Sequence, residues 1–368
     1  MQARSTLPIH VFTSFAALPA QLRRCLAHPR QANFFLSLDW FELLFETSLA
    51  ETLIPRIYVA SNLEGEPLCA LFCATARSPA DRTLLSLANF YTLDYLPSFT
   101  HDNAPKRALI RALVEQIAAE RPRWHSVRLA TMKTDAPDFS WIVAALRAAG
   151  FGVQTFFQYE NWYLPAAGLS FEDYFRNRPS QLKNAISRRQ KKLEKTHRFE
   201  IRIARAESPQ LEPMISDFVS IYGSSWKLPE PFPGFIPALA TRCAKLGILR
   251  LGVLHVDGVP AAAQLWITSA KTATIYKLAY DERYGELGVG SILSKEMFRI
   301  AIDEDGVDEI DYGVGSEAYK KDWMSSVRTI EGLQAHNRKS LNGLLLATAS
   351  DTKLLAKKMR ALLRRNPS

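Results

Sequence analysis

The sequence predicts a mixed α/β fold in which one order of helices and strands occurs twice along the chain. Two observations support this. Apolar runs of strand length alternate with segments in which apolar residues recur every three or four positions, and the same order of elements starts again at Phe199. The chain has 368 residues, of which 47% are hydrophobic, so it is large enough to form two cores.

The first copy of the repeat is predicted between residues 9 and 164. Its elements, in chain order, are a strand at 9–12, helices at 15–27 and 39–50, a hairpin of strands 54–60 and 68–76, a strand at 83–91, a helix at 105–120, a strand at 126–131, a helix at 136–149 and a strand at 152–164. The turn residues Asn62–Pro67 separate the hairpin strands. Leu109, Leu113 and Ile117 share one face of the helix at 105–120.

The second copy is predicted between residues 199 and 337. It consists of a strand at 199–204, helices at 211–222 and 235–246, a hairpin of strands 248–256 and 259–268, a strand at 273–280, a helix at 290–305, a strand at 308–313, a short helix at 316–324 and a strand at 327–337. Asp257-Gly258 is a strong signal for a two-residue hairpin turn. We therefore expect an N-terminal domain over residues 1–165, a C-terminal domain over 166–340 and a basic amphipathic tail over 341–368.

The composition favours a soluble protein of a reducing compartment. No stretch reaches the length of a transmembrane helix, and the N-terminus lacks a basic segment followed by a long apolar run, so we expect a cytoplasmic protein. Cys69 and Cys73 share one face of a predicted strand and lack the spacing of a zinc site, so we expect small buried side chains and no metal. The net charge of +9 suggests an anionic partner.

A glycine-rich turn joins the predicted strand 273–280 to the predicted helix 290–305. It reads Tyr284-Gly285-Glu286-Leu287-Gly288-Val289-Gly290-Ser291. Glycines allow the backbone to approach phosphate oxygens, and the helix that follows offers unpaired N–H groups and the positive end of its dipole. The matching turn of the first copy, from Tyr91 to Pro105, contains no glycine, so we expect no phosphate site there.

This turn resembles the pyrophosphate loop of GNAT acyltransferases, in which Arg or Gln precedes x-x-Gly-x-Gly. Gly285 occupies the position where Arg or Gln is usual, and Arg283, two residues earlier, could substitute for it. The resemblance implies two tandem GNAT-like domains and a donor site for acyl-CoA or an acyl carrier protein, without a metal. The residues it implies for donor binding are Arg283, Gly285, Leu287, Gly288, Val289, Gly290, Ser291 and Lys320.

A wider stretch is similar to the acetyltransferase-like domain of FemAB-related proteins, which occur in exopolysaccharide and cell-surface loci. The segments that resemble it are 182–189, 251–262, 275–281, 305–313 and 317–323, together with Trp226. Members of that family transfer an acyl or aminoacyl group to an amine, and take it from CoA or, in the Fem peptidyltransferases, from charged tRNA. The helical arm of the Fem proteins has no counterpart in this sequence.

The family chemistry needs a neutral amine, a polarised thioester and a proton for the leaving thiolate. Asp311, at the end of a predicted strand beside the donor site, is the first candidate for the base, and Glu317 is the alternative. Tyr319 is the candidate for protonating the thiolate. Each of these also has a purely structural interpretation, as an ion-paired carboxylate or a packed tyrosine.

The acceptor is expected to lie against aromatic and polar side chains near these strands. The candidates are Tyr91, Tyr95, Trp226, Gln264 and Tyr276. Tyr276 and Lys277 alternate on one strand, so only one of them can face the site. Aromatic residues on strands are more often part of a core than of a pocket.

Two segments are rich in Lys and Arg. The predicted helix 180–196 is either a solvated face or a binding surface for an acyl carrier protein, a tRNA or another phosphorylated ligand. Residues 353–365 alternate basic and apolar positions, which favours either peripheral contact with the inner membrane face or packing on the protein.

The sequence therefore predicts an N-acyltransferase that moves an acyl group from acyl-CoA, or an acyl carrier protein, to an amine of a small molecule or a cell-surface polymer precursor. One alternative is an aminoacyl-tRNA-dependent Fem-like transferase. The other is a non-catalytic accessory protein of exopolysaccharide biosynthesis, which the glycine at position 285 would favour.

Overall fold

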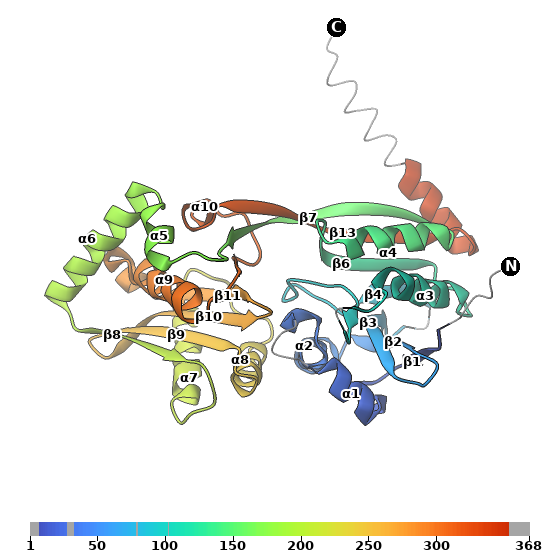
Figure 1. The fold of residues 1–368 in the computed structure, drawn as a ribbon, viewed down its shortest axis with the longest axis horizontal. Helices are drawn as coiled ribbons and strands as arrows, with labels where there is room; N and C mark the ends of the chain where they lie inside the picture. The colour runs from blue at the N-terminus through green and yellow to red at the C-terminus, as the bar shows by residue number, and fades with distance from the viewer. Residues whose placement is uncertain (1–6, 28–32, 79, 102, 353–368) are drawn as a thin grey trace, which may run out of the picture. The chain divides into compact units, whose positions relative to one another are not determined.

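The computed structural model describes residues 7–27, 33–78, 80–101 and 103–352 (Figure 1). They form two compact units. One contains residues 7–27, 35–158 and 329–352 of the described chain, and the other contains residues 33–34 and 159–328. Within the described chain, no helix combines the length and the apolar composition that crossing a membrane requires.

The first unit contains a mixed sheet with the strand order β1-β2-β3-β4-β6-β13. Its strands are β1 (Ile9–Phe12), β2 (Leu53–Ser61), β3 (Pro67–Ala76), β4 (Thr83–Ser86), β5 (Ser98–Phe99), which pairs with β3, β6 (Ser126–Lys133) and β13 (Ser326–Asn337). Its helices are η1 (Phe15–Ala17), α1 (Ala20–Leu26), η2 (Phe34–Leu36), α2 (Leu38–Leu44), η3 (Phe45–Leu49), α3 (Lys106–Ala119) and α4 (Pro137–Ala148). Helix α3 packs against α4 and buries Leu109, Leu113 and Ile117, as their spacing predicts.

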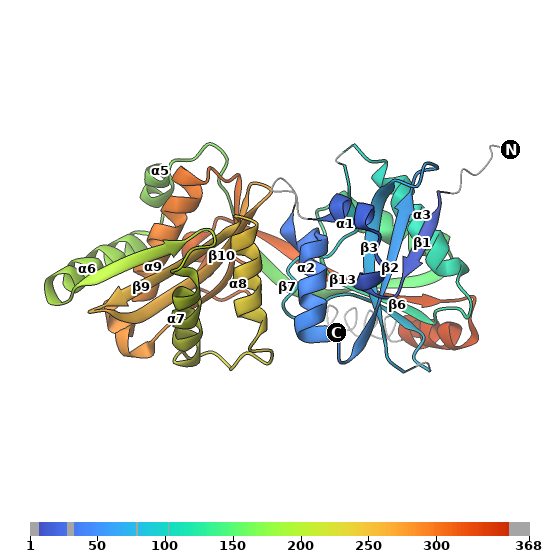
Figure 2. The same ribbon diagram turned by 90° about the horizontal axis from the view of Figure 1, so that it is seen from below.

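The second unit contains a sheet with the order β7-β12-β11-β10-β9-β8. Its strands are β7 (Phe151–Pro165), of which residues 159–165 belong to this unit, β8 (Phe199–Ala204), β9 (Leu249–Val256), β10 (Val259–Ser269), β11 (Thr272–Tyr280) and β12 (Glu309–Asp311). Its helices are α5 (Phe171–Arg176), α6 (Ser180–Thr196), α7 (Leu211–Gly223), α8 (Phe235–Lys245), η4 (Glu282–Leu287), α9 (Val289–Arg299), η5 (Ile300–Glu304) and α10 (Lys320–Trp323). Helix α9 covers one face of β9–β11, and α7 and α8 cover the other (Figure 2).

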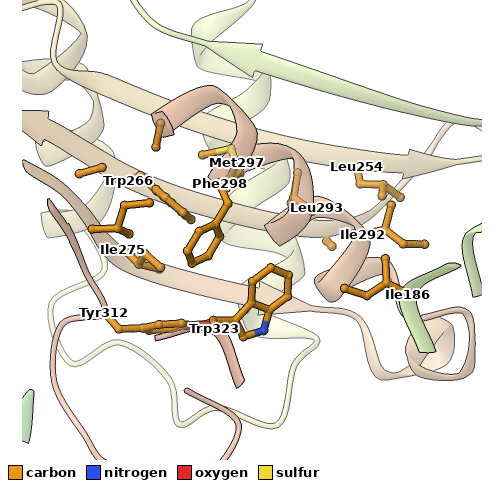
Figure 3. Packing of buried hydrophobic residues seen from close by; sticks show 14 of the residues in the cluster. Ile186, Leu254, Trp266, Ile275, Ile292, Leu293, Met297, Phe298, Tyr312 and Trp323 are labelled. Carbon is orange, nitrogen blue, oxygen red and sulfur yellow. The ribbon is translucent and has the colours of Figure 1, made fainter. Parts of the chain in front are cut away.

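The core of the second unit fixes α9 and α10 with large aromatic side chains. The rings of Phe298 on α9 and Trp266 on β10 form a T-shaped pair with centroids 5.2 Å apart. The ring of Phe298 also stacks on Trp323 of α10, at a centroid distance of 4.9 Å (Figure 3). Ile186 of α6 belongs to the same buried cluster as Ile292 of α9. Helix α6 is therefore anchored by apolar contacts in addition to its charged residues.

The two copies of the repeat exchange their final strands, which the sequence did not predict. Strand β7, which ends the first copy, pairs with β12 of the second unit through Tyr163–Pro165. Strand β13, which ends the second copy, pairs with β6 of the first unit. The expected boundaries at residues 165 and 340 therefore differ from the limits of the compact units, because the pairing of a final strand is not encoded in its own periodicity.

The first unit differs from the expectation at one strand and agrees with it at two buried cysteines. The strand expected at 83–91 ends at Ser86, because Asn89 forms a turn in which it accepts from the backbone of Tyr91 and Thr92. Cys69 and Cys73 are buried, and burial raises the pKa of each thiol to about 12. Over the described residues, no group of three or more His, Cys, Asp or Glu is arranged to hold a metal ion.

Candidate functional site

Strands β11 and β12 are paired only over a short stretch. Their parallel register joins Thr272, Ala273 and Thr274 to Glu309, Ile310 and Asp311. Beyond Thr274, β11 continues to Tyr280, while β12 ends. The edge of β11 from Ile275 onward therefore has no strand partner on the β12 side within the described chain, and it leads directly to η4 and α9.

The glycine-rich turn forms the start of α9. Gly288 has φ +67°, a left-handed conformation that favours glycine, and its N–H donates to the carbonyl of Gly285 over 3.1 Å. The N–H groups of Val289, Gly290 and Ser291 belong to the first turn of α9 and have no partner within the helix. The turn thus offers the N–H groups and dipole that an anion would require.

Several of the residues predicted to bind the donor have side chains that cannot reach it, and only their backbone could. Gly285 and Leu287 belong to the 3-10 helix η4, which the sequence had predicted as an open loop. The side chains of Leu287 and Val289 are buried in the core. An anion at this turn would therefore meet the backbone of residues 289–291.

Two side chains from other elements lie against this turn. A Cβ on Gly288 would overlap the side chain of Arg189 on α6. A Cβ on Gly290 would lie 3.2 Å from Cδ1 of Tyr280. The aliphatic part of the Arg189 side chain therefore packs against the start of α9, the turn for which the resemblance had suggested Arg283.

Arg283 has a different role from the expected one. Its guanidinium Nε donates to both carboxylate oxygens of Asp281 at 3.0 Å, and Asp281 caps η4. The hydrogen bond from Arg283 lowers the pKa of the Asp281 carboxyl. Arg283 thus stabilises the entry to the turn, because its charge is directed back toward its neighbour on the chain.

Gln264 is a structural residue and does not line an acceptor surface. It is 1% exposed, and its Nε2 donates to Oγ of Ser294 over 2.7 Å and to the carbonyl of Gly290 over 3.2 Å. Its Oε1 accepts from the indole N–H of Trp266. These bonds tie the first turn of α9 to β10, so Gln264 positions the glycine-rich turn.

Asp311 lies in a fully bonded buried network. Its Oδ2 accepts from Arg328 Nη2 at 2.6 Å, and its Oδ1 accepts from Asn161 Nδ2 at 2.7 Å and from the N–H of Gly313 at 2.8 Å. Arg328 also binds Glu309 and the side-chain oxygen of Asn161. The geometry favours the structural interpretation of Asp311, because both of its oxygens are already occupied.

Lys320 holds the turn that follows β12. It is 3% exposed, and its Nζ donates to the carbonyls of Val314 at 2.5 Å and Gly315 at 3.1 Å, and forms an ion pair with Glu317 at 2.9 Å. Burial lowers the pKa of Lys320. The geometry does not favour a contact between Lys320 and a donor phosphate, since its ammonium already bonds to these oxygens.

Glu317 and Tyr319 remain accessible on the same turn. Burial alone would raise the pKa of Glu317, but the ion pair with Lys320 outweighs it and the pKa is lowered. Tyr319 is 44% exposed and meets the ring of Tyr312 edge-on. Burial, followed by the charge of Glu317, raises the pKa of Tyr319 to about 12, so its phenol keeps its proton at neutral pH.

The predicted acceptor residues are mostly buried. Tyr91 and Tyr95 lie in the core of the first unit, and the hydroxyl of Tyr95 donates to the carbonyl of Phe72 over 2.8 Å. Tyr276 is 9% exposed. Trp226 is the exception, because it is 49% exposed and its ring lies 4.6 Å from that of Tyr280.

A cluster beside Trp226 was missed from the sequence. Lys277 Nζ forms an ion pair with Glu230 at 2.5 Å, and Glu230 also bonds to the hydroxyl of Tyr222. Lys227 Nζ lies 5.7 Å from the ring centroids of both Tyr222 and Trp226. The adjacent Trp226-Lys227 in a polar loop was the only signal, and it does not reveal which residues meet it.

Comparison with known proteins places this site in a recognised fold. Residues 180–321 match the family model described as an acetyltransferase (GNAT) domain. The solved structure "Crystal structure of FemX" matches 84% of this chain and 93% of its own, with 12% identity and a TM-score of 0.59.

Two further solved structures share the fold. The C-terminal domain (DUF2156) of a putative lysylphosphatidylglycerol synthetase from Agrobacterium fabrum has 12% identity and a TM-score of 0.50, and the match covers 80% of this chain and 88% of that one. A conserved protein of unknown function from Bacteroides thetaiotaomicron VPI-5482 has 12% identity and a TM-score of 0.51, over 86% of this chain and 95% of that one. No curated protein matches the sequence.

The family match indicates an acyltransferase domain over residues 180–321, and this stretch contains the separating strand β11 and the glycine turn at the start of α9. Residues 180–321 are thus similar to a GNAT acetyltransferase domain, and the fold of the chain is like that of FemX.

Proposed function

We propose that this protein transfers an acyl group from acyl-CoA, or from an acyl carrier protein, to an amine of a small molecule or a cell-surface polymer precursor. The observation that supports it most is the start of α9. Three N–H groups without helical partners, at Val289, Gly290 and Ser291, follow a strand whose edge is unpaired from Ile275 onward.

Both parts of this arrangement suit a phosphopantetheine donor. A pyrophosphate is bound by the first turn of a helix, where the dipole favours negative charge. The amide groups of a pantetheine arm can add to an unpaired strand edge through main-chain hydrogen bonds. Arg189 would supply a cation for the phosphates.

The chemistry requires a proton donor and an acceptor for the amine proton. The amine attacks the thioester carbonyl, the C–S bond breaks, and the thiolate takes a proton. Tyr319 supports the first role, because its phenol is protonated at neutral pH and partly exposed. Glu317 supports the second, because it is an accessible carboxylate, whereas Asp311 is enclosed by Arg328 and Asn161.

Calorimetric titration with CoA and acetyl-CoA tests the donor site. The informative variant is Ser291→Asp, since an acidic residue in the first turn stabilises a helix but repels a phosphate. Ser325→Asp, at an exposed position outside the turn, is the matched control. We expect binding to the wild type and the control and its loss in Ser291→Asp. Equal binding by all three proteins would contradict the proposed site, and no binding by any of them would contradict the CoA donor.

The outer face of α6 supports a macromolecular donor as a second candidate. Arg188, Lys191, Lys192 and Lys195 line one hollow on this helix, and Arg189 of the same helix reaches Gly288. An acyl carrier protein or an aminoacylated tRNA, as in the Fem-like alternative, would bring its phosphates to this face. Binding to each, measured at two salt concentrations, distinguishes them, and a tRNA would show the steeper salt dependence.

The remaining expectations concern cellular context. A role in exopolysaccharide or cell-envelope biosynthesis, catalytic or accessory, rests on the sequence resemblance alone. A protein that binds neither CoA nor a carrier but retains a synthase partner would favour the accessory role. The basic segment 353–365, for which the sequence left peripheral membrane contact and packing on the protein as alternatives, lies outside the described residues.

A further inference from the structure

Lys227 has a cationic group without a bonding partner in a crowded position. Its ammonium is bonded to no other group in the described chain; only its backbone N–H donates, to Ser225 Oγ. Two aromatic rings, those of Tyr222 and Trp226, lie within 5.7 Å of Nζ. A partly buried ammonium without a counter-ion destabilises the folded protein, so its presence suggests that it binds an anion.

The two carboxylates whose charges attract Lys227 are each paired with another lysine, so the Lys227 ammonium can bind a ligand anion. Glu230 is engaged by Lys277 and Tyr222, and Glu317 is engaged by Lys320. The charges that act on Lys227 are those of Lys277 and Lys320, which repel its proton, and those of Glu317 and Glu230, which attract it. Burial is the largest influence, and together they lower the pKa of Lys227 to about 8.

Lys227 is near both the glycine-rich turn before α9 and the turn that follows β12. Trp226, beside Lys227, contacts Tyr280, and Tyr280 lies against Gly285 and Gly290 of the donor turn. Glu317 and Lys320, whose charges Lys227 feels, belong to the turn after β12. Lys227 therefore follows a residue that contacts Tyr280 beside the glycine-rich turn, and it lies close enough to Glu317 for their charges to interact.

We propose that Lys227 binds an anionic oxygen group, a carboxylate or a phosphate, of the acceptor amine. The inference rests on the proposed function, and it narrows the acceptor to amines that also bear a negative charge. An oxyanion paired with Lys227 would face the aromatic surface of Trp226 and place the amine near Glu317.

The test is an NMR titration of the free protein with its lysines methylated with ¹³C. Glycine presents an amine with a carboxylate, O-phosphoethanolamine presents an amine with a phosphate, and ethanolamine presents an amine without an anion. A bound oxyanion should raise the pKa of Lys227 by about one unit or more. The Lys227→Met variant identifies the resonance, and Lys321→Met, which removes an exposed lysine of α10, is the matched control.

A shift with glycine, with O-phosphoethanolamine or with both, and none with ethanolamine, would support the proposal and name the anion. No shift with any probe, an equal shift with ethanolamine, or a shift of Lys321 as large as that of Lys227 would overturn it. The titration contains no CoA, so an oxyanion site can be present even if the proposed donor is wrong, and the two failures are distinguishable.

Discussion

Nη2 of Arg328 lies 2.6 Å from Oδ2 of Asp311, and each side chain is 9% exposed. Arg328 comes from β13 and Asp311 from β12, so this pair joins the last strand of the described chain to the strand that pairs with the start of β11. It explains why a carboxylate at the end of β12 has a structural role here.

Replacing Asp311 by Asn should lower the free energy of unfolding by about 2 kcal/mol, because a buried charge-assisted hydrogen bond to Arg328 is lost while Arg328 keeps its ion pair with Glu309. Urea denaturation measures the change. The control is Glu309→Gln, which removes the more exposed carboxylate bound to Arg328 and should cost less. If Asp311→Asn has wild-type stability, the ion pair does not stabilise the fold.

Replacing Arg189 by Met should weaken CoA binding about tenfold, since one charge-assisted hydrogen bond to phosphate would be lost. Methionine preserves most of the aliphatic contact with Gly288. Lys191→Met removes a similar charge from the exposed part of α6 and should change affinity little. Titration calorimetry compares the three proteins, and equal losses in both variants would indicate only a general electrostatic effect.

Lys227 should make stability depend on pH between about 8 and 10.5. Its folded pKa of about 8 lies below the ordinary value of 10.5, so the unfolded chain binds more protons across this range and stability rises with pH. The cost of the buried charge is fully present below pH 8. Lys227→Met should therefore be more stable than wild type at pH 7, and the advantage should disappear by pH 10.5.

Urea denaturation of both proteins at several pH values measures that difference. Taking the difference cancels the titration of all shared groups. A constant difference between pH 7 and 10.5 would show that Lys227 has an ordinary pKa in the folded protein.

Replacing Lys320 by Met should destabilise the second unit by about 1–3 kcal/mol, because the carbonyls of Val314 and Gly315 would lose their donor. Lys321→Met, one residue later and exposed, should have almost no effect. Chemical denaturation of the two variants provides the comparison. Equal stability of the two would mean that solvent replaces the lysine at this turn.

The order of elements could be predicted from the sequence because it depends on local signals. The turn at Asp257-Gly258 has the expected left-handed backbone, with φ +50° and +81°, and the glycine turn precedes α9 as predicted. Helix boundaries agree to within a few residues for α3 and α7. These features are decided by neighbours along the chain.

The site was predicted less well because its geometry depends on distant residues. Nothing in the pattern around Arg189 shows that it reaches Gly288, and nothing around Lys227 shows that Glu230 prefers Lys277. Gln264 and Tyr95 were chosen for their chemistry, but their polar groups bond within the cores. Polar side chains on buried strands are satisfied internally, which a sequence pattern does not distinguish from binding.

The exchange of β7 and β13 determines which fragments of this protein can fold when they are expressed separately. A fragment cut at the sequence repeat, at residues 166–340, would lack the segment of β7 that pairs with β12 and would retain a β13 whose partner β6 is absent. Each half expressed alone would expose an orphan strand edge and aggregate, whereas co-expression of the two halves should restore a native complex. The repeat in the order of elements is therefore not a repeat of independent folding units, because each half completes the sheet of the other.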